Sequence, residues 1–290
     1  CYNSEGERFM TKWDLVMMER ATRAVLSRAI FHEVKAGRES QHGGIYCSVA
    51  HMPQSFIMEK IKKIERTRTF VKLKEAGIDL HRDYIETGCS VHYCQGGCNV
   101  NSKCETDKIG LYAIGEVASG AKDGADRMES NSLPYCMAMG IIAGREAAER
   151  AKMVRMPEID DTQVNRFKKK ALTPLERQDG VSVFKVRPQL QDLMTKETAH
   201  VSTKDGLERV KDEVERYKKE IVQKLYVRNK SRKFNFEWIN VLEFKNLLLI
   251  AECIARNALL RTESRGSHDR EDYPKPDPSW FKNIHFRLVD

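Results

Sequence analysis

The stretch "GLYAIGEVASGAKDGADRMESNSL", residues 110–133, carries the signals that most constrain the fold. Its first part predicts a short strand within 110–118, and a glycine-rich turn follows over 119–127. The next residues, 131–153, are rich in small side chains and predict a helix that packs closely on a sheet or a cofactor.

A second informative stretch is "HYCQGGC", residues 92–98, which lies in another region of predicted short strands, 90–101. Four cysteines in and around it have the spacing C-x4-C-x3-C-x5-C, which matches no standard zinc or ferredoxin pattern. We therefore expect no metal site and interpret the four cysteines as small side chains buried under a ring-shaped cofactor such as a flavin. Metal or iron–sulfur ligation and a thiol–disulfide role are the alternatives. The four are Cys89, Cys94, Cys98 and Cys104.

The residues before this region predict a mixture of helices and short strands. Apolar residues at helical spacing predict a helix within 18–38 that stops at Gly37. One or two further helices are predicted over 54–77, after a β-rich segment at 43–53. Residues 1–10 predict a loop that leads into an exposed hairpin.

The residues after this region are helical by pattern. A polar break at 155–163 precedes a helical region, 164–262, whose short connectors predict antiparallel neighbours. The polar, proline-containing residues 264–290 predict an extended tail.

The composition excludes several classes of protein. The 290 residues carry a net charge of +8, but basic and acidic residues interleave, as in "KDEVERYKKEIVQK" (211–224), which is typical of a solvated helix face rather than a nucleic-acid surface. Eight cysteines are too few for a disulfide scaffold. The most apolar stretch, 240–260, contains four charged residues and predicts a core helix rather than a membrane span.

Three sets of motifs, in series, resemble the flavoprotein subunits of succinate dehydrogenase and fumarate reductase, a family that includes L-aspartate oxidase. They are "GERFM" with "TRAVLSRAIFHEVKAGR", "HYCQGGC" with the 110–133 stretch, and "RTESRGSHDREDYP". The resemblance implies α/β plus α architecture. Its parts are the remainder of a capping domain (1–90), the last segment of a dinucleotide-type FAD-binding domain (91–155), a helical bundle (164–262) and an extended tail (263–290).

The family's GxGxxG turn, which holds the FAD pyrophosphate, does not occur in these 290 residues. We therefore expect a fragment or one half of a split flavoprotein. The N-terminal half of the FAD domain would then come from another chain or from a missing segment.

The resemblance also implies residues that contact the substrate. The family's proton-donor arginine lies ten residues before the glutamate that matches Glu33, which assigns the role to Arg23, with Arg20 and Arg28 as competing registers. His92 and Arg127 match the histidine and the arginine that bind substrate carboxylates, for which the planar guanidinium is well suited.

A further set of residues matches the family's FAD contacts. Gly96 and Gly97 would let the backbone approach the flavin, and Glu116 matches the glutamate that binds the FAD ribose. The helix opening at Asn131, Ser132 and Leu133 would direct its N–H groups toward the flavin ring. Asp123 replaces the family's histidine and would repel an anionic flavin or substrate.

The expected function is hydride transfer between FAD and a C=C or CH–CH bond beside a carboxylate. The implied partners are the N-terminal half, a small carboxylate substrate and an iron–sulfur electron-transfer subunit. The alternatives are a related reductase acting on enoyl- or aromatic-CoA substrates and a non-catalytic docking subunit. The expected location is the cytoplasm, either free or at the membrane surface through partner subunits.

Overall fold

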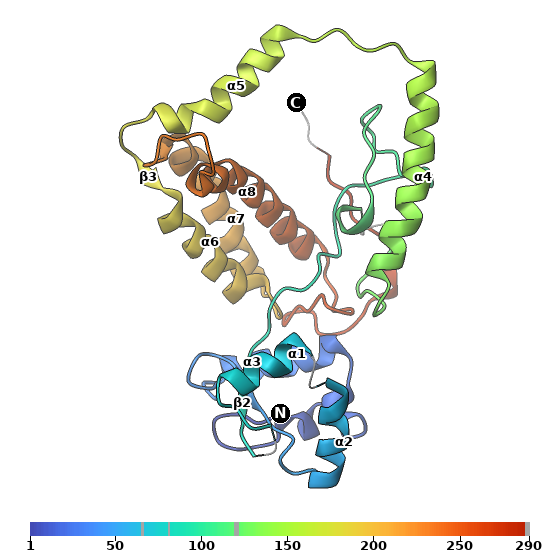
Figure 1. Cartoon of the computed structure of the whole chain (residues 1–290), viewed down its shortest axis with the longest axis vertical. Helices are drawn as coiled ribbons and strands as arrows, with labels where there is room; N and C mark the ends of the chain where they lie inside the picture. Colours follow the sequence, from blue (N-terminus) through green and yellow to red (C-terminus); the bar gives the residue numbers. More distant parts are fainter. Residues whose placement is uncertain (65–66, 81, 119–121, 288–290) are drawn as a thin grey trace. The chain divides into compact units, whose positions relative to one another are not determined.

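The computed structural model describes residues 1–64, 67–80, 82–118 and 122–287. The chain divides into two compact units, Cys1–Val91 and His92–Asp290, and each has its own hydrophobic core. Figure 1 shows the order of the elements along the chain.

The first unit combines short helices with one small sheet. Strands β1 and β2 pair antiparallel, with Ile45 opposite Thr87. The elements in chain order are the 3-10 helices Phe9–Lys12 and Met18–Arg20, α1 (Arg23–Lys35), β1 (Ile45–Cys47), α2 (Gln54–Ile64), α3 (Arg68–Glu75) and β2 (Ile85–Thr87).

The core of the first unit is built on the "GERFM" motif. Phe9 and Met10 are fully buried and pack with Ala29 and Ile30 of α1. The expectation of an exposed hairpin after the N-terminal loop is therefore wrong, because these two apolar side chains form the centre of the unit within a 3-10 helix.

The helix predictions for the first unit are confirmed. The hydroxyl of Thr22 accepts a hydrogen bond from the backbone N–H of Val25 and caps α1. Gly37 and Gly77 follow α1 and α3 with φ of 75° and 77°, a left-handed conformation that ends a helix and favours glycine.

The first part of the second unit contains a 3-10 turn, Gly115–Val117, and the long helix α4, Ser132–Met153. Over the described residues of 90–118, pairing is limited to two isolated bridges, Gly97 with Ala118 and Glu105 with Tyr112. The predicted short strands are therefore wrong. Residues with positive φ interrupt the extended backbone, namely Gly97, Cys104, Gly110 and Gly115. Residues 119–121 of the predicted turn lie outside the described residues.

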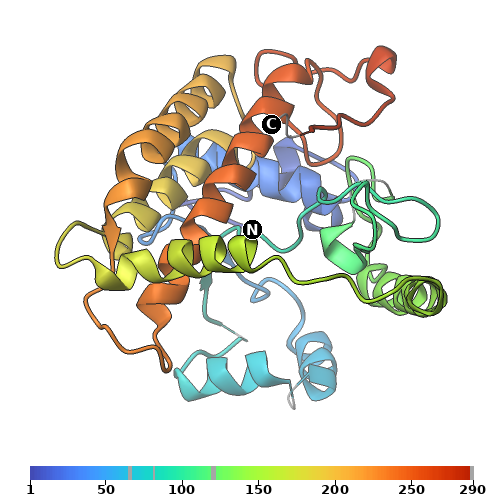
Figure 2. The ribbon, with the colours of Figure 1, turned by 90° about the horizontal axis from the view of Figure 1, so that it is seen from above.

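The rest of the second unit is a helical bundle, and its last three helices lie side by side in Figures 1 and 2. Its core includes Val210, Tyr217, Phe244 and Leu248. The elements are α5 (Asp161–Glu176), β3 (Val181–Ser182), α6 (Val183–Thr198), α7 (Lys204–Arg216), a π turn (Tyr217–Ile221), a 3-10 turn (Val222–Lys224), β4 (Leu225–Tyr226) and α8 (Phe236–Leu260).

The described residues after α8, 261–287, form an irregular tail that contains the 3-10 turn Pro278–Trp280. Isolated bridges join Ser202 to Arg270 and Arg265 to His268, so the tail is held by specific pairings. Among the helices the structure describes, none combines the length and the apolar character that a bilayer crossing requires.

Candidate functional site

Arg127 and the "HYCQGGC" stretch lie together in the second unit. Arg127 is 5% exposed, and its guanidinium carbon lies 4.4 Å from the centre of the Tyr93 ring. Its Nη1 donates a hydrogen bond to the carbonyl of Met128 at 3.1 Å. Stacking on an aromatic face stabilises a buried guanidinium and fixes its plane. The structure therefore places an oriented cation beside the residue that follows His92.

His92 itself is exposed and begins the second unit. Its neighbour Tyr93 is half-buried and contacts Arg127, so the backbone leads His92 to the same region as the arginine.

A second cation, Lys122, lies next to this pair. Its Nζ is 3.3 Å from the centre of the Tyr135 ring on α4 and 3.4 Å from the Tyr93 hydroxyl. The same Nζ is 3.3 Å from Oδ2 of Asp123, whose side chain is 2% exposed. Asp123 was expected to repel an anionic flavin or substrate. That expectation leaves out Lys122, which compensates the carboxylate charge at contact distance.

Glu116 ties the 3-10 turn to the "HYCQGGC" loop. Its Oε1 accepts a hydrogen bond from the backbone N–H of Cys94 at 2.8 Å. Glu116 is otherwise exposed, so the second carboxylate oxygen can serve a ligand hydroxyl.

The two glycines of "HYCQGGC" have different environments. A Cβ on Gly97 would lie 2.0 Å from the carbonyl oxygen of Val117, so close packing of two backbone segments requires glycine there. A Cβ on Gly96 would meet only the Cys94 sulfur, at 4.0 Å, among the atoms described. The absence of a side chain at Gly96 therefore leaves space beside the loop. The glycine at position 97 is instead required by the close packing of the loop against Val117.

The N-terminus of α4 lies at the predicted position. Asn131 is the N-cap residue, but its side chain makes no capping hydrogen bond. Ser132 opens the helix and Leu133 is 74% exposed. The first N–H groups of α4 are thus available to a ligand that carries negative charge.

Arg23 belongs to the first unit, where it is the first residue of α1 and is exposed. The glutamate that set its register, Glu33, is 3% exposed and forms a two-bond ion pair with Arg38, with distances of 2.7 and 3.0 Å. Asn3 donates a third hydrogen bond to Glu33. The hydrogen bonds from Arg38 lower the pKa of Glu33 despite its burial, so this carboxylate is a structural anchor for the unit.

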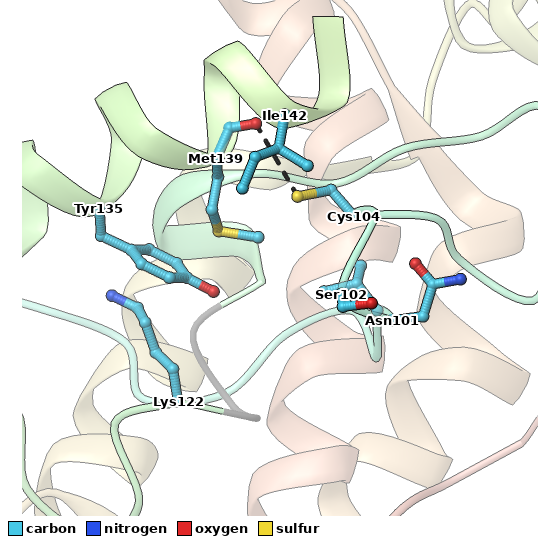
Figure 3. Close-up of a pocket in the computed structure, with 8 residues that line it drawn as sticks. Asn101, Ser102, Cys104, Lys122, Tyr135, Met139 and Ile142 are labelled. Atoms are coloured by element: carbon cyan, nitrogen blue, oxygen red, sulfur yellow. Dashed lines mark hydrogen bonds between the residues drawn. The ribbon is translucent and has the colours of Figure 1, made fainter. Parts of the chain in front are cut away.

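An open pocket of about 300 Å³ lies between α4 and the loop that contains Cys104 (Figure 3). The Cys104 thiol donates to the Met139 carbonyl at 3.8 Å, and burial raises the pKa of both Cys104 and Tyr135. The volume is at the small end for ligand sites. The lining residues are Val100, Asn101, Ser102, Cys104, Lys122, Tyr135, Met139 and Ile142.

The four cysteines do not share one environment. Cys104 is buried within the chain, whereas Cys89, Cys94 and Cys98 are exposed on it, so burial of these three under a flavin stays a prediction. In the described part of the chain, no group of three or more histidine, cysteine or acidic side chains is arranged to hold a metal ion.

Sequence reasoning did not single out Lys122 and Tyr135. Lys122 directly precedes Asp123, so the adjacent opposite charge was a usable signal. Tyr135 lies in the first turn of α4, but the sequence does not show that its ring faces a lysine from a distant loop.

Two family models match the chain. The model of the FAD binding domain matches residues 1–133, and the model of the fumarate reductase flavoprotein C-terminal region matches residues 187–287.

Similar proteins align with nearly all of this chain. It is 31% identical over 284 residues to a fumarate reductase (CoM/CoB) subunit from Methanothermobacter marburgensis, covering 97% of this chain and 50% of the relative. It is 34% identical over 275 residues to an L-aspartate oxidase from Yersinia pestis, covering 93% and 46%. The chain thus spans about half the length of these relatives.

Solved structures show the same fold. A Mycobacterium smegmatis Sdh1 structure in complex with UQ1 matches with a TM-score of 0.82 and 32% identity, covering 96% of this chain and 46% of that one. An E. coli quinol fumarate reductase structure matches with a TM-score of 0.83 and 25% identity, covering 97% and 50%. The chain belongs to the family of FAD-dependent oxidoreductases that includes the flavoprotein subunits of fumarate reductase and succinate dehydrogenase and L-aspartate oxidase.

Proposed function

We propose that the chain is the C-terminal part of an FAD-dependent reductase or dehydrogenase that acts on a C=C or CH–CH bond beside a carboxylate. The observation that carries this proposal is Arg127, a buried cation stacked on Tyr93, the residue that directly follows His92. Binding an anion to a cation already held in place requires little reorganisation, which favours a carboxylate ligand.

The residues of the second unit fit the ribose and ring portions of FAD. Glu116 retains a carboxylate oxygen for a hydroxyl, Gly96 leaves space beside the loop, and the start of α4 offers N–H groups at Ser132 and Leu133. When bound, FAD supplies the group that accepts or donates hydride.

The roles of this chain's own side chains follow from their chemistry. Arg127 would hold one substrate carboxylate through paired N–H groups, and His92 would hold the other carboxylate or orient it. Arg23 would deliver the proton to the carbon opposite the hydride position, from the first turn of α1.

We expect α4 to contact an N-terminal half of the FAD domain. The chain spans about half the length of its relatives, and the FAD-domain match ends within α4, at residue 133. The helix exposes Leu133, Met137 and Ile141, each more than 60% exposed. Such a series of apolar side chains on one helix is typical of an interface. The family resemblance implies an iron–sulfur subunit as the electron carrier, and the fumarate reductase and succinate dehydrogenase relatives are themselves named as subunits.

The proposal is tested with the flavin-loaded protein that contains both halves. Anaerobically reduced flavin should be reoxidised when fumarate is added, as followed by absorbance. In Arg127→Ala, we expect the rate at low fumarate to fall by roughly 100-fold, because a charge-assisted pair to substrate is lost. Flavin content should be unchanged.

The control is Arg232→Ala, which removes an exposed arginine in the loop before α8. It should leave both flavin content and fumarate reduction unchanged. Reoxidation by another alkene but not by fumarate would overturn the dicarboxylate assignment. Full activity of Arg127→Ala would overturn the role of the arginine.

A further inference from the structure

The tail turn after α8 contacts the loop that carries Arg127. The backbone N–H and the hydroxyl of Ser267 both donate to the carbonyl oxygen of Ala125, each at 2.9 Å. The hydroxyl also lies 3.4 Å from Oε1 of Gln95. Because a hydroxyl has a single hydrogen, the shorter contact is the principal bond and Gln95 is a secondary acceptor.

Close backbone contact reinforces these bonds. Gly266 has φ of +58°, and a Cβ added there would lie 2.4 Å from the Ala125 oxygen and 3.1 Å from the Ala125 Cβ. Only glycine admits this approach without displacing the loop. Ala125 precedes Arg127 by two residues, so a displacement at Ala125 is transmitted directly to the arginine.

The tail turn is itself held firmly. Glu263 is fully buried and accepts hydrogen bonds from Arg261, Arg265 and the backbone N–H of Asp277. The Ser264 hydroxyl donates to the Tyr273 carbonyl at 2.8 Å and accepts from the Arg270 N–H at 2.9 Å. A turn with this many internal bonds can position a neighbour rather than follow it.

Gln95 connects the same turn to the other side of the site. Its Nε2 lies 3.5 Å from Oδ1 of Asp126, the residue before Arg127. Gln95 also follows Tyr93, the ring on which Arg127 stacks, by two residues. Ser267 therefore touches both segments of the Tyr93–Arg127 pair.

We propose that Gly266 and Ser267 are positioning residues that set the location of Arg127 for the substrate carboxylate. This proposal rests on the carboxylate-binding role of Arg127 given above. A side chain at position 266, or loss of the hydroxyl at position 267, shifts the guanidinium relative to Tyr93 and weakens substrate binding without removing the cation.

The test uses the complete flavin-loaded protein and compares KM for fumarate with kcat. Gly266→Ala is expected to raise KM between about 10-fold and 100-fold, the scale of effect of a misplaced positioning group. Ser267→Ala is expected to raise it several-fold, and Ser267→Thr, which keeps the hydroxyl, should restore most of the affinity. Flavin content should stay at the wild-type level in all three.

Gly180→Ala is the matched control. It places a Cβ 2.1 Å from the Lys224 carbonyl oxygen at a φ of +141°, so it imposes comparable backbone strain in the helical bundle. It should lower Tm but leave KM unchanged.

A double variant separates this proposal from the function on which it rests. In the Arg127→Ala background, Gly266→Ala should produce no further rise in KM, because the group it displaces is gone. If Arg127→Ala leaves KM unchanged, the proposed function fails. If Arg127→Ala raises KM but Gly266→Ala and Ser267→Ala do not, or if their effects add fully to that of Arg127→Ala, the positioning role is overturned. If Gly266→Ala does not fold, the comparison of KM between Ser267→Ala and Ser267→Thr tests the positioning role by itself.

Discussion

Arg127 is buried beside Tyr93, and its burial is the basis of its expected selectivity. A guanidinium that is largely removed from water loses hydration, and the Tyr93 ring and the Met128 carbonyl contribute to replacing it. A carboxylate pairs with a guanidinium through two parallel charge-assisted hydrogen bonds. A neutral ligand of the same shape cannot, so the site is expected to discriminate by charge.

The neighbouring Lys122 and Asp123 form a charge pair with low exposure of both side chains, 14% and 2%. Such a pair adds little net charge to the site. The ammonium group of Lys122 also lies over the Tyr135 ring, which draws the loop toward α4. These contacts make Lys122 a link between the arginine loop and the helix.

At the residue scale, the pH dependence of the tail can be predicted from Glu263. Hydrogen bonds from Arg265 hold the pKa of this carboxyl at about 2 against the opposing effect of burial. Because the folded pKa lies below the usual 4.5, the unfolded chain binds the proton first as pH falls. The stabilisation from Glu263 is complete above about pH 5 and is lost between about pH 4.5 and 2.

Glu263→Gln should therefore lower the free energy of unfolding on the order of 3 kcal/mol at pH 7, since it leaves two arginines without their carboxylate. The difference from wild type should shrink in urea titrations at pH 4 and pH 3. Glu158→Gln, at an exposed position, should show no difference at any pH. A constant difference across this range would contradict the assignment.

At the scale of elements, the 3-10 turn Gly115–Val117 is set against α4 by one glycine. Gly115 has φ of +67°, and a Cβ there would lie 2.7 Å from the Cys136 sulfur. The turn carries Glu116, so this contact also determines where the Glu116 carboxylate is presented. The packing of turn on helix thus places the expected ribose contact and the helix N-terminus in one region.

Gly115→Ala tests this packing. It should reduce the free energy of unfolding by about 2–3 kcal/mol, combining roughly 1 kcal/mol for the left-handed backbone with the steric conflict at Cys136. Flavin binding in the complete protein should weaken in parallel, as measured by flavin release on dilution.

Gly124→Ala is the control, since Gly124 has φ of +59° and open space around its Cβ position. It should show only the backbone effect. Adding Cys136→Ala to Gly115→Ala should recover part of the steric loss. If Gly115→Ala and Gly124→Ala lowered the free energy of unfolding and flavin binding by equal amounts, a specific role for the contact with α4 would be contradicted.

At the scale of the whole molecule, the expected chemistry draws on both units. Arg23 lies in Cys1–Val91, whereas His92, Arg127 and the expected FAD contacts lie in His92–Asp290. The proposed proton donor and the proposed carboxylate-binding groups therefore belong to different units of the chain.

The apolar residues on α4 provide the test at this scale. Met137 is 70% exposed in the second turn of the helix, and Met137→Glu should leave the helix content of the chain unchanged. It should weaken assembly with an N-terminal half, because the interface would have to bury a charge. Weaker assembly would be measured as less N-terminal half co-purifying with the chain and as a lower flavin content of the complex. Phe167→Glu on α5, where Phe167 is 55% exposed, should assemble normally. Normal assembly of Met137→Glu would rule out this part of α4 as the contact.

The sequence by itself determined the helices, their ends and the family. The helices at 23–35 and 236–260 follow from local apolar spacing, and Gly37 and Gly77 stop helices through their own backbone freedom. The ion pair of Arg265 with Glu263, at 2.9 Å, also joins residues only two positions apart. These features depend on residues close together in the chain, and the family motifs are likewise local. The roles of Arg23, His92 and the FAD contacts stay predictions.

Only the tertiary structure decided how distant segments meet. It placed Phe9 and Met10 in a core, reduced the predicted strands at 90–118 to isolated bridges, and set Lys122 between Asp123 and the Tyr135 ring. It also joined Ser267 to Ala125, which lie 142 residues apart. The physical reason is that such contacts depend on which surfaces pack together, and local periodicity records only that a face is apolar, not which partner it meets.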